Sequence, residues 1–251
     1  MKAVGSAIFG SLLLFVCTTM AAREFPPGRV ARLQYINGSV SIQPQGTQDW
    51  VPGAVNRALT TSDNVWTDKN SRAELGVGTG VLRMNGETSL TLTNISMGTV
   101  QVTLHQGTLN LRVFHLFGGE FYEVDTPNVV FTVRKSGEYR FDVDSGGDTT
   151  LVTVWKGEGN ATGEGPAVRV RSHEQARFTG TMLTRNIHPA PRPDGFDNWC
   201  QVRNERSQHA LYGPYVAPGV VGYPPPYVYP APYPYGYGPW VWVAPWGWVR
   251  R

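Results

Sequence analysis

Apolar and polar residues alternate in one short run after another between Gly107 and Thr179. The alternation is clearest over residues 107–113, 138–144 and 149–157. Successive side chains of a β-strand point to opposite faces, so a strand with one buried face has this two-residue period, whereas a helix repeats about every 3.6 residues. No long helical pattern interrupts the runs. The segment therefore predicts an all-β domain.

Further short strands are expected before and between these runs, separated by the Gly, Asn, Asp and Ser residues that turns favour. They fall at residues 31–35, 40–42, 65–67, 72–77, 81–84, 89–92, 100–104, 121–127 and 129–133. Asn37-Gly38 lies between the first two strands and suits a type I′ turn, in which both central residues have positive φ. We therefore expect the first two strands to pair as a hairpin.

The even spacing of short strands favours a sandwich or jelly-roll over a parallel α/β sheet. A β-solenoid is the alternative, although the sequence has no fixed repeat period. We expect this β domain to extend over residues 27–184. A domain of roughly 160 residues buries about 70% of the surface that its unfolded chain exposes, so its core can hold it together.

The N-terminus has the pattern of a secretory signal peptide over residues 1–22. Lys2 precedes an uncharged stretch with an apolar centre from Leu12 to Val16, and small residues lie before Arg23. This order of a charged start, a short apolar centre and a small-residue cleavage site is typical of signal peptides. It predicts a periplasmic or secreted protein. The alternative is an uncleaved anchor, which would give membrane contact through this segment alone.

Residues 185–210 are expected to form a linker with one short helix. Three prolines mark the exit from the β domain, and Phe196, Trp199 and Cys200 then fall at helical spacing. We expect the helix from about Asp197 to Gln208, with these three side chains docked on the β domain as an apolar stripe. A signal peptide cleaved before Arg23 would leave Cys200 as the single cysteine, so a disulfide within the chain is excluded.

Residues 211–251 form a low-complexity tail rich in Pro, Tyr and Trp that contains no acidic residue. Its prolines favour extended polyproline II segments. Tyr and Trp offer a large contact area with few rotatable bonds, which suits protein or glycan partners. The candidate binding residues of the tail are Tyr227, Tyr229, Trp240, Trp242, Trp246 and Trp248.

The charge of the chain and the spacing of its histidines argue against nucleic-acid binding and against a zinc site. Residues 23–210 contain all nineteen acidic residues and nineteen of the 22 Lys and Arg residues, so this body is neutral and shows no electrostatic footprint for nucleic acid. The histidines form neither a His-Glu-x-x-His motif nor a Cys/His cluster with zinc spacing. We expect no nucleic-acid partner, no metal, no cofactor and no catalytic residue. A hydrolase with an unrecognised carboxylate pair stays open, because such a pair has no fixed spacing in sequence.

An ordered series of short motifs over about 150 residues resembles the FecR domain of bacterial envelope proteins. The motifs are Gly38-Ser-Val-Ser-Ile42, Asp49-Trp-Val-Pro52, Leu59-Thr-Thr-Ser-Asp-Asn-Val-Trp-Thr67, Arg72-Ala-Glu-Leu75, Gly107-Thr-Leu-Asn-Leu-Arg-Val113, Val124-Asp-Thr-Pro127, Tyr139-Arg-Phe-Asp-Val143 and Val152-Thr-Val-Trp-Lys-Gly157. More narrowly, the chain resembles exported bacterial proteins that join such a domain to Phe196-Asp-Asn-Trp-Cys200 and a Tyr/Pro/Trp-rich end.

The resemblance implies a domain suited to protein contact. The regulators that give the family its name act on a sigma factor through a cytoplasmic segment before the membrane span, and very few residues precede the apolar stretch of this sequence. We therefore do not expect sigma-factor regulation. The expected function is that of an exported, non-enzymatic binding or scaffold module of the bacterial cell envelope that mediates protein–protein contact. The alternative partner is a glycan, peptidoglycan included, bound through the C-terminal aromatic residues.

Overall fold

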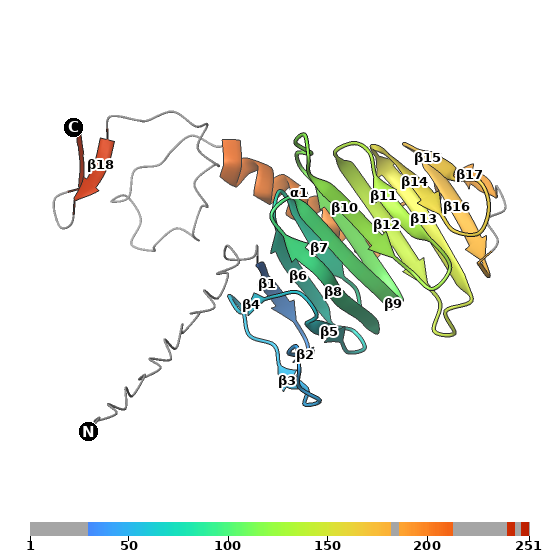
Figure 1. Ribbon diagram of the computed structural model, residues 1–251, viewed down its shortest axis with the longest axis horizontal. Coiled ribbons are helices and arrows are strands. Elements are labelled where there is room, and N and C mark those ends of the chain that lie inside the picture. Colours follow the sequence, from blue (N-terminus) through green and yellow to red (C-terminus); the bar gives the residue numbers. More distant parts are fainter. Residues whose placement is uncertain (1–29, 182–185, 213–239, 244–246, 251) are drawn as a thin grey trace, which may run out of the picture.

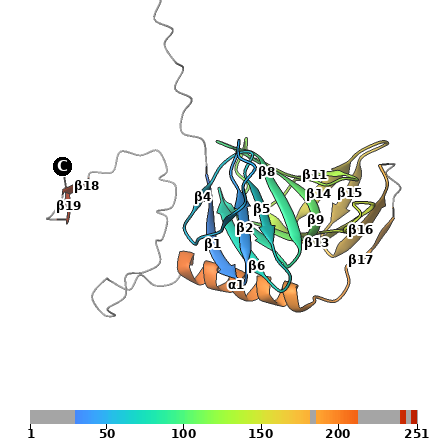
Figure 2. The same cartoon turned by 90° about the horizontal axis from the view of Figure 1, so that it is seen from below.

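The computed structural model describes residues 30–181, 186–212, 240–243 and 247–250. Between residues 30 and 189 the described chain forms a two-layer β-sandwich, and one helix, α1 (Gly195–Tyr212), lies against one of its faces (Figure 1, Figure 2). This confirms the predicted all-β class followed by a single short helix. The predicted signal peptide, residues 1–22, lies outside the described residues.

One layer, sheet A, faces α1. Its strands, in spatial order, are β4 (Ala58–Leu59), β1 (Ala31–Asn37), β6 (Arg72–Val77), β7 (Gly80–Met84), the second half of β9 (Thr99–Val113), β12 (Gly137–Val143), β13 (Thr149–Lys156), β16 (Glu174–Thr179) and β17 (Ile187–Pro189). All neighbours in this sheet are antiparallel.

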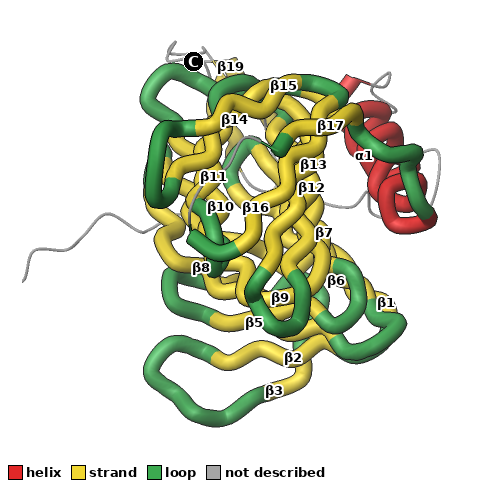
Figure 3. The backbone as a smooth tube through the Cα atoms, turned by 90° about the vertical axis from the view of Figure 1, so that its right-hand side faces the viewer, coloured by secondary structure: helices red, strands yellow, loops and turns green. Residues whose placement is uncertain are grey.

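The other layer, sheet B, lies on the side away from the helix (Figure 3). Its strands, in spatial order, are β3 (Val51–Pro52), β2 (Val40–Gln43), β5 (Asn64–Thr67), β8 (Thr88–Ser96), the first half of β9, β10 (Phe121–Asp125), β11 (Val130–Val133), β14 (Glu158–Thr162) and β15 (Val168–Arg171). Strands β9 and β10 are parallel, and the other neighbours are antiparallel.

The chain alternates between the two sheets while it advances from β1 and β2 on one side of the molecule to β15–β17 on the other (Figure 1). Strand pairs therefore stack in sequence order, as they would in a solenoid, yet the result is a sandwich of two open sheets. Each strand turns its apolar positions toward the facing sheet. In β9 these are Leu109, Leu111 and Val113, all at most 1% exposed, and burial of each such side chain contributes about 1.5–3 kcal/mol.

Strand β9 joins the two sheets and bends at Gly107. Residues up to Gln106 pair with β8 in sheet B, and residues from Gly107 onward pair with β12 in sheet A. Gly107 has φ = +92°, and a Cβ atom there would lie 2.6 Å from the Cα atom of Thr88. Only glycine suits both the backbone angle and this close approach. The bend explains why the two strands expected at 100–104 and 107–113 are one continuous strand.

The predicted hairpin between residues 31–35 and 40–42 is wrong. Strand β1 pairs with β4 and β6 in sheet A, whereas β2 pairs with β3 and β5 in sheet B. Gly38 has φ = +79° and Asn37 does not have a positive φ, so the segment is no type I′ turn. It carries the chain from one sheet to the other, because the strands before and after it bury their apolar side chains from opposite layers.

Strand β17 pairs with β16, so sheet A continues past residue 184, where we expected the β domain to end. The short strands β3 and β4 also escaped prediction, because two residues are too few to show an alternating pattern. The helix begins at Gly195 and ends at Tyr212, longer at both ends than the predicted segment from Asp197 to Gln208.

We expect Gly107→Ala to lower the free energy of unfolding by about 2 kcal/mol or more, because Ala strains the backbone at positive φ and its Cβ meets the backbone of Thr88. Gly118→Ala is the matched control, since no atom lies within 4 Å of its added Cβ. Urea unfolding followed by circular dichroism measures both. Equal midpoints for the two variants would contradict the role of the bend.

Candidate functional site

The clearest concentration of charged side chains lies where α1 covers the outer face of sheet A. The helix begins with a capping box. The Asp194 carboxylate accepts hydrogen bonds from the N–H groups of Phe196 (2.7 Å) and Asp197 (3.0 Å), and the Asp197 carboxylate accepts one from the N–H of Asp194 (2.9 Å). Such reciprocal bonds satisfy donors that a helix start leaves unpaired. They fix the point at which the helix begins on the sheet.

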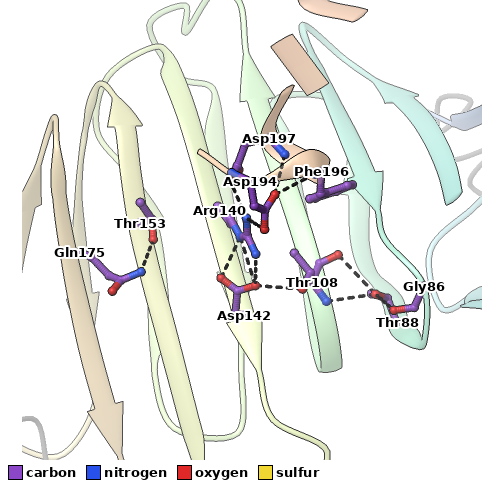
Figure 4. Close-up of polar contacts among 10 residues, drawn as sticks. All are labelled: Gly86, Thr88, Thr108, Arg140, Asp142, Thr153, Gln175, Asp194, Phe196 and Asp197. Atoms are coloured by element: carbon purple, nitrogen blue, oxygen red, sulfur yellow. Dashed lines mark hydrogen bonds and ion pairs between the residues drawn. The ribbon is translucent and has the colours of Figure 1, made fainter. Parts of the chain in front are cut away.

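Arg140 of β12 binds the start of this helix to sheet A through ion pairs (Figure 4). Its Nη1 lies 2.7 Å from both the Asp194 and the Asp197 carboxylate, and its Nε and Nη2 each lie 2.9 Å from Asp142 of the same strand. Thr108 of β9 donates a further hydrogen bond to Asp142 (2.9 Å). One guanidinium thus joins three carboxylates from the helix start and from the sheet.

The two helix-start carboxyl groups have opposite pKa shifts. Burial would raise the pKa of Asp194, but the N–H of Asp197 and the Arg140 guanidinium outweigh it and lower that pKa to about 2. Burial raises the pKa of Asp197 above its usual value. The Asp194–Arg140 pair is therefore charged over the whole physiological range.

A second group of ions lies further along the helix and is more deeply buried. Arg83 of β7 is fully buried, and its Nε donates to the Glu74 carboxylate of β6 at 2.7 Å. Arg203 of the helix donates to both oxygens of the same carboxylate, at 2.7 and 2.9 Å. Burial alone would raise the pKa of Glu74, but the hydrogen bonds and charges of Arg203 and Arg83 lower it below its ordinary value of 4.5.

Asn204 extends this group across the sheet. Its side-chain oxygen accepts a hydrogen bond from Arg83 Nη1 (2.7 Å), and its amide donates to Glu138 of β12 (3.1 Å). Asn110 of β9 donates to the other oxygen of Glu138 (3.2 Å). Polar side chains of β6, β7 and β12 thus contact α1, and Asn110 of β9 supports Glu138 from behind. We call these contacts, together with those of Arg140, the helix clasp.

Apolar and aromatic contacts complete the helix clasp. Phe196 and Cys200 are buried, as the predicted apolar stripe requires. Trp199 packs between Phe196 and Tyr35 of β1, with ring centroids 5.7 and 5.8 Å apart, and Arg203 lies 4.2 Å from the Tyr35 ring centroid. A cation over an aromatic face adds about 0.5–2 kcal/mol, so the helix is held by both charge and packing.

The helix clasp is built to hold a helix rather than to carry out a reaction. Glu74, Asp142, Asp194 and Asp197 face guanidinium groups at hydrogen-bond distance, and Glu138 accepts hydrogen bonds from Asn110 and Asn204. Burial raises the pKa of the Cys200 thiol to about 12, which leaves it protonated and unreactive. Within residues 30–181 and 186–206, no three His, Cys, Asp or Glu side chains gather as metal ligands.

Sequence patterns alone did not reveal the clasp residues. Glu74, Arg83 and Asn110 occupy the outward positions of alternating strands, which usually face solvent, yet they are at most 4% exposed. The available signal was the helical spacing of Phe196, Trp199 and Cys200. An apolar helix stripe needs a face to cover, and the outward residues of sheet A provide it.

The predicted binding residues of the tail are only partly within the described ranges. Trp240 and Trp242 lie in β18 (Trp240–Val243), and Trp248 lies in β19 (Gly247–Arg250). These two strands pair antiparallel, with Trp242 opposite Trp248. Tyr227, Tyr229 and Trp246 lie outside the described residues. Their role in binding stays a prediction.

Comparison with known proteins identifies the central part of the sandwich. The model of the FecR protein family matches residues 63–158, which run from the start of β5 to the start of β14. This confirms the resemblance seen in the sequence. None of the curated proteins matches the chain.

Two crystal structures of a candidate anti-sigma factor from Parabacteroides distasonis are also similar, at 15% and 14% sequence identity and with TM-scores of 0.45 and 0.47. The similarity covers 51% and 55% of this chain and 59% and 64% of those chains. This chain therefore spans about six tenths of the length of the structures that it matches.

The family match corrects the expected localisation. FecR-type proteins are inner-membrane proteins with a cytoplasmic side, so the expectation of a protein that is only periplasmic or secreted is wrong. Among the residues with described structure, no helix has both the length and the apolar character needed to cross a bilayer.

We expect Glu74→Gln to lower the free energy of unfolding by about 3–5 kcal/mol near pH 7, because it leaves the buried Arg83 without a compensating charge. The folded-state pKa of Glu74 lies below 4.5, so this stabilisation is complete above that pH and is lost as the pH falls through the lower value. Urea unfolding at a series of pH values should show the wild-type advantage shrinking below pH 4.5. Glu205→Gln, at an exposed helix position, is the control. A constant difference at all pH values would refute the assignment.

Cys200 reports whether the helix is docked. In a Cys17→Ser background, we expect a thiol reagent to label Cys200 only through opening of the helix, because the thiol is buried and protonated. Arg140→Met removes the clasp at the helix start and should speed labelling by about tenfold or more, the change that 1.4 kcal/mol gives. Arg177→Met, at an exposed position of β16, is the control. Rapid labelling of Cys200 in the protein with Arg140 intact would show that α1 is not held on sheet A.

Proposed function

We propose that this chain is a FecR-type module that acts by contact with another protein and has no catalytic activity. The single observation that carries the proposal is the family match over residues 63–158. That segment contains β9 and its neighbours in both sheets, so the match covers the central strands of the sandwich. FecR-type proteins are regulatory and contact other proteins rather than convert substrates.

The arrangement of ionisable groups supports a binding role. Catalysis by a carboxylate pair needs two acids that can exchange protons with a substrate in a cleft. In the helix clasp, Glu74, Asp142, Asp194 and Asp197 instead face guanidinium groups at 2.7–2.9 Å. These pairs stabilise the docked helix, and each of the four carboxylates has at least one oxygen atom in contact with a guanidinium group.

A protein is the partner class that we propose. The expected alternative, a glycan bound through the tail aromatics, has no support from the family match. The helix clasp gives the module a fixed C-terminal helix that leads into residues 213–251. We propose that the six aromatic residues of the tail assist contact with the same protein partner.

Photo-crosslinking of the full chain in its native bacterium tests the proposal. We expect a discrete adduct with one protein, which then rebinds the purified full chain in vitro at a defined stoichiometry. Replacement of the six tail aromatics with Ser should weaken this rebinding and leave sedimentation with peptidoglycan unchanged. Substrate turnover that is lost when a single Asp or Glu is replaced, or the absence of any rebinding protein, would overturn the proposal.

A further inference from the structure

Several turns gather at one end of the sandwich, which we call the loop end. It comprises residues 78–79, 97–98, 114–120, 134–136, 157 and 172–173. The strand registers place them together. Val113 lies opposite both Gly80 and Gly137, and Arg171 lies opposite Glu158. Phe121, which follows the longest of these turns, lies beside Thr99 at the start of β9.

Exposed apolar side chains are concentrated on one part of the loop end. Met97, Phe117 and Phe121 are 78%, 52% and 38% exposed. Phe121 lies next to the turn that holds Met97, because its N–H donates to the carbonyl of Gly98 at 2.6 Å. Single exposed apolar residues are normal on a protein surface, but two on turns with a third at the start of the strand beside them are typical of a contact site.

A cationic hollow of about 700 Å³ adjoins these apolar side chains. It is lined by Leu116, Arg134, Lys135, Ser136, Gly157, Glu158, Arg171 and Ser172. Three of these residues are cations and one is an acid. Leu116 precedes Phe117 directly, so the same loop connects the hollow to the exposed apolar residues.

The positive charge of the hollow is only partly balanced from within. Glu158 lies 3.6 Å from Lys135 of the lining and also 3.9 Å from Arg169 of β15, which lies outside the lining, so one carboxylate faces two cations. Both of these cations are more than half exposed. Exposed charges of one sign attract a partner of opposite sign and raise its rate of association.

The floor of the hollow is rigid. The Tyr139 hydroxyl donates to the carbonyl of Lys135 (2.5 Å) and accepts a hydrogen bond from the N–H of Glu158 (3.1 Å). The N–H groups of Arg134 and Lys135 donate to the carbonyl of Glu158 at 2.9 and 3.2 Å. These bonds fix the turn that carries two of the cations. A surface that is already ordered loses less conformational entropy when a partner binds.

The chain itself offers no acidic segment for this surface. Residues 207–251 and 182–185 contain no Asp or Glu, and residues 1–29 contain only Glu24. Charge complementarity therefore points to another molecule. The neutral body argues against a nucleic acid as that molecule, and the exposed Met and Phe side chains favour a partner with apolar side chains of its own.

We propose that the loop end is the docking surface for an acidic segment of a partner protein, whose carboxylates lie over the cationic hollow while its apolar side chains contact Met97, Phe117 and Phe121. This rests on the proposed function, since it names the chemistry of the protein partner. The binding is salt-sensitive, because exposed charges separated by more than about 8–10 Å are screened at physiological ionic strength.

Fluorescence anisotropy of a labelled synthetic peptide in which Glu alternates with Leu and Phe tests this in the full chain. We expect salt-sensitive binding that weakens about tenfold or more in the triple variant Arg134→Glu, Lys135→Glu, Arg171→Glu. The double variant Met97→Ser, Phe117→Ser should also weaken binding. The matched control reverses three exposed cations outside the loop end, Lys69→Glu, Arg177→Glu and Arg192→Glu, and should bind as the wild type does. Thermal unfolding confirms that each variant is folded.

Three results would overturn the inference. One is absence of peptide binding, another is equal weakening in the triple variant and its control, and the third is preference for an oligothymidylate or for phosphatidylglycerol vesicles over the peptide. A peptide in which Lys replaces every Glu must not bind. None of these results bears on the proposed function, because a protein captured by crosslinking can rebind the triple variant through another surface.

Discussion

The bend of β9 at Gly107 is the constraint on which the rest of the fold depends. Strand β9 pairs with β8 and β10 in sheet B and with β7 and β12 in sheet A. The position of its bend therefore sets how the two layers face each other and which residues of these four strands lie opposite β9. The bend is possible because glycine tolerates both positive φ and close contact with Thr88. A two-layer core then forms from the alternating apolar residues. Each additional pair of strands extends this core toward the side of β15–β17.

The helix clasp provides partners for the polar residues on the outer face of sheet A. Sheet A buries its apolar residues inward, and its outward residues include Glu74, Arg83 and Asn110, which are polar. A helix that covers them must supply matching charges and hydrogen bonds, because a buried unpaired charge costs several kcal/mol. Arg203 does so for Glu74 and Asn204 for Arg83, while Asn110 donates to Glu138 of the sheet, and Arg140 contacts the carboxylates at the helix start. Charge matching therefore fixes the position of the helix more specifically than packing of Phe196 alone could.

The sequence predicted what depends on local pattern and missed what depends on long-range pairing. Alternation identified the central strands, and the spacing of Phe196 and Cys200 identified the helix and its buried stripe. Asn37-Gly38 was misread as a hairpin turn, because a turn motif does not show whether the next strand returns to the same sheet. Likewise, Arg83 occupies a strand position that usually faces solvent, and one of the contacts that bury it comes from Asn204, far along the chain.

The fold leaves the two kinds of charged surface with different physical roles. In the helix clasp, acids and guanidinium groups are paired, and apart from Asp194 they are buried or half-buried, so their interactions hold α1 on the sheet. At the loop end, Lys135 shares Glu158 with Arg169 of the neighbouring strand β15, and both cations are exposed to solvent, where their attraction for other molecules varies with salt. The proposed contact function needs both, because a rigid frame presents a surface whose charge is not already balanced. The buried pairs therefore hold α1 on sheet A, and we propose that the exposed cations contribute to the choice of partner.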